Sequence, residues 1–323
     1  MINWWLDKGI DGFRMDVINF ISKWPSLPDG DPVVGKTLGF CGAEFYFYGP
    51  CLHAYLHEMN RNCFGRGDKE YVTVGECGGL GIETAKLTTA DTRQELSMVF
   101  NFDHLDNPGH MRFDEYQYDL RKAVKTILKW QVEYTNHCWP TLLFENHDNP
   151  RVTSKVDPTD TYTPEIAKLC AVMEMTLKGS PFIYQGQELG MTNTHFDSMD
   201  DVRDVESINF YNKLVAKGKK SEKALRIING GSRDHARTPM QWTAEPGAGF
   251  TDGTPWIGIN KNAVRLNAAD EANVPDSVLN DFKRLIALRH ANPALVYGDF
   301  TIVPGGVRMW FATSAPWTAT LSL

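Results

Sequence analysis

The sequence predicts an α/β fold built on parallel strands, and three observations support this prediction. The chain has 323 residues, enough for two domains or for one α/β barrel with an appendage. Helical and strand-like segments alternate along the first 190 residues, as parallel strands with crossover connections require. Polar residues follow four of the five expected strands, where parallel α/β folds place their active sites.

The composition is that of a globular protein with a large core. Hydrophobic residues make up 42% of the chain and charged residues 23%. There are 33 Lys and Arg against 40 Asp and Glu, a net charge of −7, which disfavours a nucleic-acid partner. No apolar run approaches the roughly 18 residues of a membrane span, and the start lacks the features of a signal peptide. We therefore expect a cytoplasmic protein without a membrane partner; the sequence makes no prediction of its oligomeric state.

The cysteines show no metal-binding or disulfide pattern. None forms a Cys-x-x-Cys pair, and no histidine lies at a spacing typical of zinc sites. In a chain of this size without a secretion signal we expect free and mostly buried thiols. They are Cys41, Cys51, Cys63, Cys77, Cys138 and Cys170.

The expected elements begin with the end of a helix, closed by Gly9 as a C-terminal cap. Met1 is therefore expected to lie inside a helix of a longer protein. Alternating β-favouring residues over 10–18 predict the first buried strand. Short strands are expected at 71–76, 97–102, 140–144 and 180–184, and helices at 52–62, 118–135 and 163–177.

The second half of the chain is less regular. Residues 190–275 are rich in Gly and Pro with few clear periods, which predicts a long functional loop. Apolar residues on one face predict a helix over 276–292. A strand is expected over 294–303, and the remaining tail is expected to complete no unit.

Three carboxylates, Asp16, Glu76 and Asp148, follow expected strands. Their wide separation excludes one helical cluster but suits neighbouring strands of one barrel. A retaining glycosidase needs two carboxyl groups about 5–5.5 Å apart, one as nucleophile and one as acid. Each acid taken alone is better explained as an ordinary surface or helix-cap residue. The succession of polar strand ends is what favours a site.

The neighbours of two acids suggest their charge states. Arg14 precedes Asp16 by two residues, so both side chains of a strand face the same way. A guanidinium at that position favours the ionised carboxylate of Asp16. The residues before Glu76 are mostly apolar, and apolar surroundings favour the protonated form that a general acid needs.

Several segments resemble the signature segments of glycoside hydrolase family 13, the α-amylase superfamily. Residues 12–18 resemble its nucleophile segment, residues 74–76 its acid/base segment, and residues 145–151 its third-carboxylate segment. The resemblance runs to about residue 303 and implies a (β/α)8 TIM barrel of the α-amylase type. Longer segments resemble sequences of the oligo-1,6-glucosidase and α-glucosidase branch; they lie at 16–23, 181–191 and 236–242.

The resemblance also implies residue roles. It makes Asp16 the nucleophile, Glu76 the acid/base and Asp148 the stabiliser of the transition state. The implied substrate-binding residues are Arg14, His147, Arg237 and Val17.

Two of these residues have a structural alternative, and one bears on specificity. His147 is also compatible with a packed, hydrogen-bonded histidine, and Arg237 with a structural ion pair. In relatives, valine at the position of Val17 accompanies α-1,6 cleavage and threonine accompanies α-1,4 cleavage. The resemblance therefore implies a small oligosaccharide substrate such as isomaltose. An α-1,4-glucoside and trehalose 6-phosphate remain alternatives.

Compared with the family's pattern, part of the barrel is expected to be absent from this chain. The five expected strands match strands 4 to 8 of the barrel, so the amino-terminal third and its metal-binding loop are missing. We therefore expect no metal and no other cofactor. The expected domains are a partial catalytic barrel over 1–293 and the beginning of a truncated C-terminal β-domain over 294–323. Five strands leave two open sheet edges, so an inactive fragment or a sugar-binding remnant is the alternative of another class.

Overall fold

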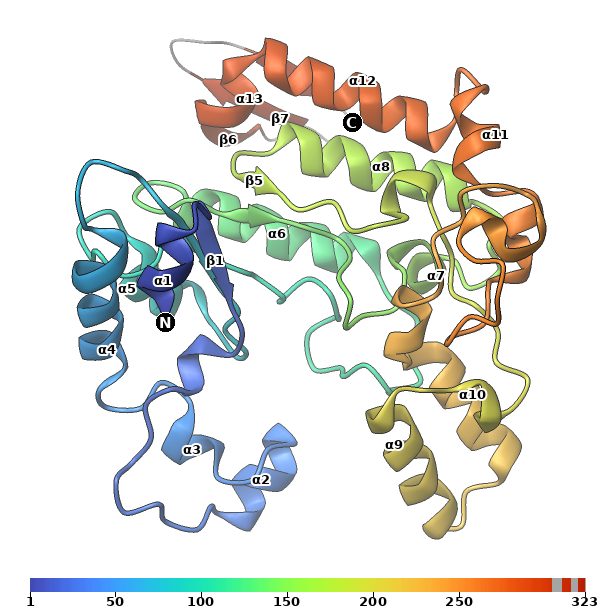
Figure 1. Ribbon diagram of the computed structural model, residues 1–323, viewed down its shortest axis with the longest axis horizontal. Helices are drawn as coiled ribbons and strands as arrows, with labels where there is room; N and C mark the ends of the chain where they lie inside the picture. Colours follow the sequence, from blue (N-terminus) through green and yellow to red (C-terminus); the bar gives the residue numbers. More distant parts are fainter. Residues whose placement is uncertain (304–309, 315–318, 323) are drawn as a thin grey trace. The chain divides into compact units, whose positions relative to one another are not determined.

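A computed structural model describes residues 1–303, 310–314 and 319–322 (Figure 1). The chain divides into two compact units. Unit 1 comprises residues 1–102 and 129–141, and unit 2 comprises residues 103–128 and 142–323. The division crosses helix α6 (Leu120–Tyr134).

Unit 1 is built on a three-stranded parallel sheet in the order β1-β2-β3. Met15 and Gly75, the last residues of β1 and β2, are partners in the register. The two strands approach closely at Gly12, where a Cβ atom would lie 1.8 Å from the carbonyl oxygen of Val72. Only glycine therefore fits at this position. The strands are β1 (Gly12–Met15), β2 (Val72–Gly75) and β3 (Met98–Val99).

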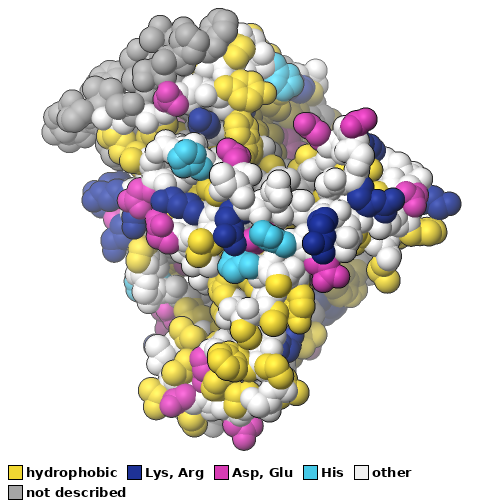
Figure 2. Space-filling view, turned by 90° about the vertical axis from the view of Figure 1, so that its left-hand side faces the viewer, with side chains coloured by type: hydrophobic (Ala, Val, Ile, Leu, Met, Phe, Trp, Pro, Cys, Tyr) yellow, Lys and Arg dark blue, Asp and Glu magenta, His cyan; other side chains and the backbone are white. Residues whose placement is uncertain are grey.

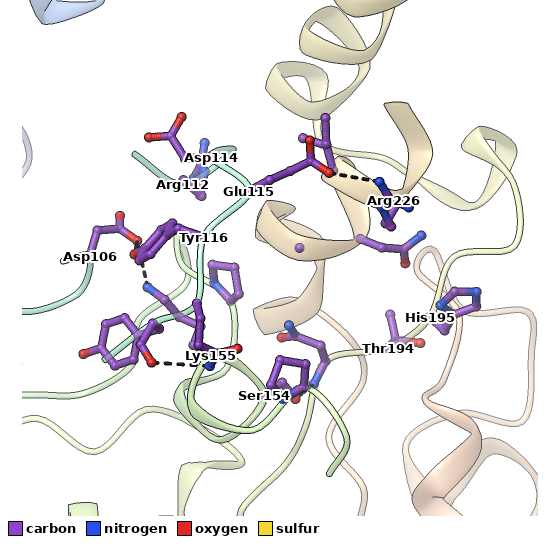
Figure 3. Close-up of a pocket in the computed structure, with 18 of the residues that line it drawn as sticks. Asp106, Arg112, Asp114, Glu115, Tyr116, Ser154, Lys155, Thr194, His195 and Arg226 are labelled. Carbon is purple, nitrogen blue, oxygen red and sulfur yellow. Dashed lines mark hydrogen bonds and ion pairs between the residues drawn. The ribbon is translucent and has the colours of Figure 1, made fainter. Parts of the chain in front are cut away.

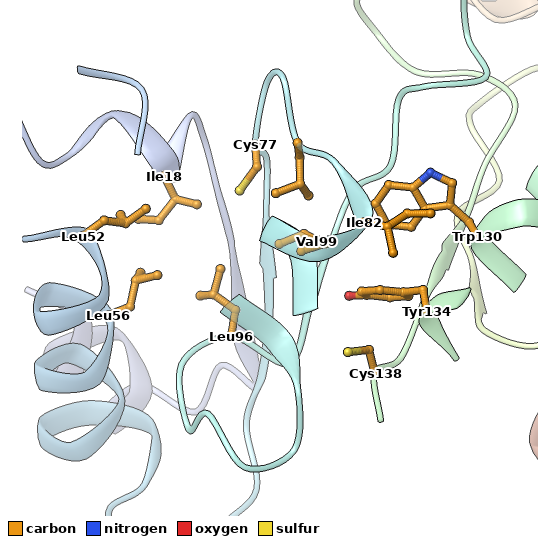
Figure 4. Packing of buried hydrophobic residues seen from close by; sticks show 12 residues of the cluster. Ile18, Leu52, Leu56, Cys77, Ile82, Leu96, Val99, Trp130, Tyr134 and Cys138 are labelled. Carbon is orange, nitrogen blue, oxygen red and sulfur yellow. The ribbon is translucent and has the colours of Figure 1, made fainter. Parts of the chain in front are cut away.

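One apolar cluster joins the helices of unit 1 to this sheet (Figure 4). Leu52 and Leu56 lie four residues apart, hence on one face of α4, and both are buried. They belong to the same cluster as Val99 of β3 and as Trp130 and Tyr134 of α6. The other elements are α1 (Ile2–Asp7), α2 (Pro32–Leu38), α3 (Ala43–Tyr46), α4 (Leu52–Met59), its π-helical extension Asn60–Phe64, and α5 (Ile82–Thr89).

Unit 2 is mainly helical. Helices α8 (Thr163–Thr176) and α12 (Val278–Ala291) pack together, and Ala167 and Ala171 of α8 contribute small buried side chains to their interface. A second cluster joins α8 to Leu142 of strand β4, which pairs with β5 in a two-stranded sheet. The remaining elements are β4 (Thr141–Leu142), β5 (Ser180–Pro181), α7 (Val152–Val156), α9 (Val205–Ala216), α10 (Ser221–Gly231), α11 (Ala268–Ala272) and α13 (Pro293–Tyr297).

Most expected elements are present. The helices expected over 52–62, 118–135, 163–177 and 276–292 are α4, α6, α8 and α12, and the five expected strands are β1 to β5, each shorter than expected. The expectation of one long loop over 190–275 is wrong, because α9 and α10 lie inside it. Asp204 caps α9 by accepting hydrogen bonds from two backbone N–H groups, and α10 buries Ile227 and Ile228.

The end of the chain also differs from the expectation. The strand predicted over 294–303 begins only at Asp299, because Pro293 opens helix α13. The tail, for which no unit was expected, pairs with that strand in an antiparallel sheet of order β6-β7-β8. The domain boundary at residue 293 stays a prediction. The strands are β6 (Asp299–Val303), β7 (Trp310–Ser314) and β8 (Ala319–Ser322).

All six cysteines are free, as expected, but only three are buried. Cys41 and Cys51 are exposed, since both lie in the loop-rich segment around α2 and α3. Within the described part of the chain, no helix combines the length and apolarity needed to cross a bilayer.

The core of unit 2 contains a buried carboxylic acid, Glu174. Glu174 of α8 is fully buried, and burial raises the pKa of its carboxyl to about 8. The Nε2 atom of Gln187 donates a hydrogen bond of 2.6 Å to its Oε2 atom. The native state therefore holds this proton up to a higher pH than the unfolded chain, whose carboxyl titrates near 4.5.

We expect Glu174→Gln to stabilise the protein at pH 8 and to change its stability little at pH 5. Between about pH 4.5 and 8 the native state binds more protons than the unfolded state, so wild-type stability falls as the pH rises. Each unit by which the pKa differs between the native and unfolded states corresponds to about 1.4 kcal/mol in the free energy of unfolding. Urea unfolding at both pH values measures the effect, with Glu165→Gln on the exposed first turn of α8 as the control. An unchanged pH slope in Glu174→Gln would contradict the prediction.

Candidate active site

Two predicted catalytic carboxylates stand at the carboxyl ends of neighbouring parallel strands in unit 1. Asp16 directly follows Met15 of β1, and Glu76 directly follows Gly75 of β2. The N–H of Glu76 donates to the Met15 carbonyl at 2.8 Å, and the N–H of Ile18 donates to the Glu76 carbonyl at 3.1 Å. Backbone hydrogen bonds therefore continue past the strands and fix the two carboxylate-bearing segments against each other.

Arg14 links the two carboxylates. Its Nη1 atom lies 2.5 Å from Oδ1 of Asp16, and its Nη2 atom contacts Oε2 of Glu76. Asp16 and Arg14 share a side of the chain, as their spacing predicts. The apolar surroundings expected for Glu76 are only part of its environment, because a guanidinium also borders it. Asp16 has a 69% exposed side chain and Glu76 a 17% exposed one, so the first is open to solvent in unit 1 and the second is largely shielded.

Val17 makes the turn that follows Asp16. Its φ of 38° lies in the left-handed region, which a β-branched residue rarely adopts and which costs about 1–2 kcal/mol. The Phe20 N–H donates to the Val17 carbonyl, closing a 3-10 helix over Ile18–Phe20. The turn leaves the Val17 side chain exposed beside Asp16.

In unit 2 a buried ion pair closes the loop that carries the third carboxylate. Arg151 and Glu145 are both buried, and Nη1 of Arg151 lies 2.8 Å from Oε2 of Glu145. The same nitrogen donates to the Gln185 carbonyl at 2.8 Å. His147 and Asp148 lie between the two partners in the sequence. The ion pair therefore fixes both ends of the segment on which they stand.

Asp148 is surrounded by donors. Its Oδ1 atom lies 2.7 Å from Nη2 of Arg237 and 3.3 Å from Nη1 of Arg233. Its Oδ2 atom lies 3.3 Å from Nε2 of His147, and its carbonyl accepts a hydrogen bond of 2.6 Å from Arg112. The predicted ligands His147 and Arg237 thus both meet the predicted stabiliser. His147 has a 52% exposed side chain, which does not fit the alternative of a packed histidine.

Arg112 and Arg233 are site residues that the sequence analysis missed. Glu206 of α9 forms ion pairs with both and ties them together near Asp148. Arg233 lies four residues before Arg237, and a 3-10 helix over Arg233–Ala236 joins the two, so their proximity in the sequence was an available signal. Arg112 stands in a loop without periodicity, so no local pattern points to it.

The predicted catalytic residues belong to different units. Asp16 and Glu76 lie in unit 1, and Asp148 lies in unit 2. Their convergence around one sugar-sized site, which the resemblance implies, stays a prediction. Among the described residues, no group of three or more His, Cys, Asp or Glu side chains is arranged to hold a metal ion.

Unit 2 also contains a cavity of about 670 Å³ that the sequence analysis did not predict (Figure 3). Two ion pairs lie in its lining, Glu115 with Arg226 and Lys155 with Asp106. Arg112 lines the cavity and contacts the Asp148 loop, so the two features adjoin.

Comparisons with known proteins cover nearly the whole chain. The family profile described as alpha amylase, catalytic domain, matches residues 1–298. An oligo-1,6-glucosidase of Halalkalibacterium halodurans is 41% identical over 305 residues, which is 94% of this chain and 54% of that protein. The trehalose-6-phosphate hydrolase of Escherichia coli is 39% identical over 313 residues, 95% of this chain and 54% of that protein. The chain therefore spans about half the length of these curated relatives.

Two solved structures also superpose on nearly the whole chain. The trehalose-6-phosphate hydrolase of Bacillus licheniformis superposes with a TM-score of 0.86 at 39% identity, over 97% of this chain and 56% of that one. Isomaltulose synthase from Erwinia rhapontici superposes with a TM-score of 0.88 at 36% identity, with the same coverage.

We expect Arg151→Met to destabilise the protein by about 3–5 kcal/mol, because it leaves the buried Glu145 carboxylate without its cation. Glu145→Gln alone should also be destabilising, and the double variant should lose less than the sum of the two. A double-mutant cycle from urea unfolding measures this coupling, expected to exceed about 1 kcal/mol. Additive losses would show that the two side chains do not act as a pair.

Proposed function

Because this chain belongs to the alpha-amylase family, glycoside hydrolase family 13, we propose that it is a retaining α-glucosidase that removes terminal α-1,6-linked glucose from short oligosaccharides such as isomaltose. One observation carries the proposal: a single guanidinium, that of Arg14, contacts both Asp16 and Glu76. Retaining cleavage needs two carboxyl groups about 5–5.5 Å apart, and carboxylates held on the two terminal nitrogens of one arginine are compatible with that spacing.

We also propose how the observed strands correspond to those of a complete barrel. We assign β1 to β5 to strands 4 to 8 of a (β/α)8 barrel, and residues 294–323 to the beginning of a C-terminal β-domain. The parallel order β1-β2-β3 supports this assignment, as does the superposition on solved relatives over 97% of the chain.

In the proposed mechanism Asp16 attacks the anomeric carbon and forms a glucosyl ester, while Glu76 gives its proton to the departing glycosidic oxygen. Glu76 then takes a proton from water, the water oxygen attacks the anomeric carbon, and the Asp16 carboxylate leaves. Arg14 pairs with Asp16, the attacking carboxylate. It also stabilises the carboxylate that Glu76 becomes once its proton is transferred.

The residues around the third carboxylate stabilise the sugar during these steps. We assign Asp148 to the sugar hydroxyls, where its charge favours the positive oxocarbenium-like transition state. Arg237 holds one carboxylate oxygen of Asp148 in place, and the exposed imidazole of His147 is available to a hydroxyl of the same glucose.

A second candidate is the hydrolysis of trehalose 6-phosphate. It is favoured by the 39% identity to the Escherichia coli trehalose-6-phosphate hydrolase and by the superposition on the Bacillus licheniformis enzyme of that name. A sugar-binding remnant without turnover is the alternative candidate of another class.

We expect glucose release from isomaltose to exceed release from maltose and from trehalose 6-phosphate, measured as initial rates at equal substrate concentration. Asp16→Asn should lower the rate by about 10³-fold or more, because it removes the nucleophile. Asp7→Asn in α1, also exposed, is the matched control and should leave the rate unchanged. A maltose preference would end the α-1,6 assignment, and the absence of glucose release from all three substrates would favour the remnant.

We further expect Val17→Thr to lower the ratio of kcat/KM for isomaltose to that for maltose by about fivefold, corresponding to about 1 kcal/mol. The change keeps the shape of the side chain but adds a hydroxyl beside Asp16, where the second sugar departs. Val132→Thr on the exposed face of α6 is the control. The same ratio in wild type and Val17→Thr would remove Val17 from the specificity determinants.

A further inference from the structure

Four aromatic side chains cluster in unit 1. The rings of Phe20 and Phe47 stack with their centroids 4.3 Å apart and their planes 29° apart. Tyr46 meets both edge-on, at 5.3 and 5.2 Å, and Phe40 tilts against Phe47 at 5.7 Å. These four residues, Phe20, Phe40, Tyr46 and Phe47, are called the aromatic platform here.

The aromatic platform lies against the segment that follows Glu76. A Cβ atom on Gly79 would lie 3.5 Å from the Phe47 ring, and one on Gly78 would lie 4.0 Å from Phe20 Cζ. The Asn19 side chain donates a hydrogen bond of 3.0 Å to the Gly78 carbonyl and fixes the contact. Two glycines thus bring the rings to within van der Waals distance of the segment that follows Glu76.

The aromatic platform is partly open to solvent. Phe40 is 48% exposed, and the other three rings are half-buried. The surrounding segment exposes further apolar side chains, and Figure 2 shows hydrophobic side chains gathered at the lower end of its view, over α2 and α3. Exposed apolar surface that is gathered in one place marks binding sites, because leaving it in water is unfavourable.

We propose that the aromatic platform binds the leaving sugar of the substrate, an inference that rests on the proposed glucosidase function. Glu76 must touch the oxygen that joins the two sugars in order to protonate it. The leaving sugar therefore lies beside Glu76, and the platform contacts Gly78 and Gly79, which follow Glu76 by two and three residues. The C–H groups on a face of a pyranose ring pack against the electron-rich face of an aromatic ring.

Among the four rings of the platform, we expect substitution of Phe40, the most exposed one, to impair the use of isomaltose most. The test compares isomaltose, whose leaving group is a sugar, with α-glucosyl fluoride, whose leaving group is a fluoride ion. We expect Phe40→Ala to lower the ratio of kcat/KM for isomaltose to that for the fluoride about fivefold to tenfold. Phe40→Trp should restore most of the ratio, because it keeps an aromatic face. Val33→Ala, an exposed apolar residue of α2 outside the platform, is the matched control.

A binding measurement separates this proposal from the proposed function. Titration calorimetry in the Asp16→Asn background, which removes turnover, gives the affinities for isomaltose and glucose. We expect Phe40→Ala to weaken isomaltose binding about fivefold relative to glucose binding.

The two proposals can then fail separately. Suppose that α-glucosyl fluoride is hydrolysed but that Phe40→Ala changes neither the kcat/KM ratio of isomaltose to the fluoride nor the affinity ratio of isomaltose to glucose. The role of the platform is then rejected, and the glucosidase function is retained. If neither substrate is hydrolysed but isomaltose binding depends on Phe40, the glucosidase is overturned and the platform stands. Isomaltose binding that is absent, or that is indifferent to Phe40, overturns the platform in either case.

Discussion

Backbone hydrogen bonds between β1 and β2 hold the candidate site together, since they determine where Asp16 and Glu76 leave the sheet. Met15 and Gly75 occupy the same position of the register, so the two carboxylates emerge at one edge. Arg14 lies two residues before Asp16 and reaches both acids from there. A slip of one residue would turn one set of side chains to the opposite face and separate the charges.

The two units stabilise their charged residues in different ways. In unit 1 an arginine shared by two carboxylates stands partly in solvent, with Asp16 open to solvent and Glu76 largely shielded. In unit 2 the ion pair of Glu145 and Arg151 is buried, and it fixes both ends of the segment that carries Asp148. The first arrangement suits proton transfer, whereas the second suits a residue that must keep both its charge and its position.

The sequence predicted features that depend on near neighbours along the chain. The strand before Glu76, the helix that begins at Leu52 and the placement of Arg14 beside Asp16 depend on local sequence, and all three are present. The contact of Arg112 with Asp148 joins residues 36 positions apart, and no local pattern encodes it. Helices α9 and α10 escaped prediction because glycines and short polar stretches around them hid their periodicity.

The free thiols described above have a practical consequence for labelling. Burial raises the pKa of the Cys77 thiol to about 12, which suppresses the reactive thiolate directly beside Glu76. Cys41 is exposed and adjoins Phe40 in the sequence. A maleimide fluorophore would therefore attach next to the aromatic platform while sparing the turn that carries the acid, and replacing the exposed Cys51 by serine would make that attachment more selective.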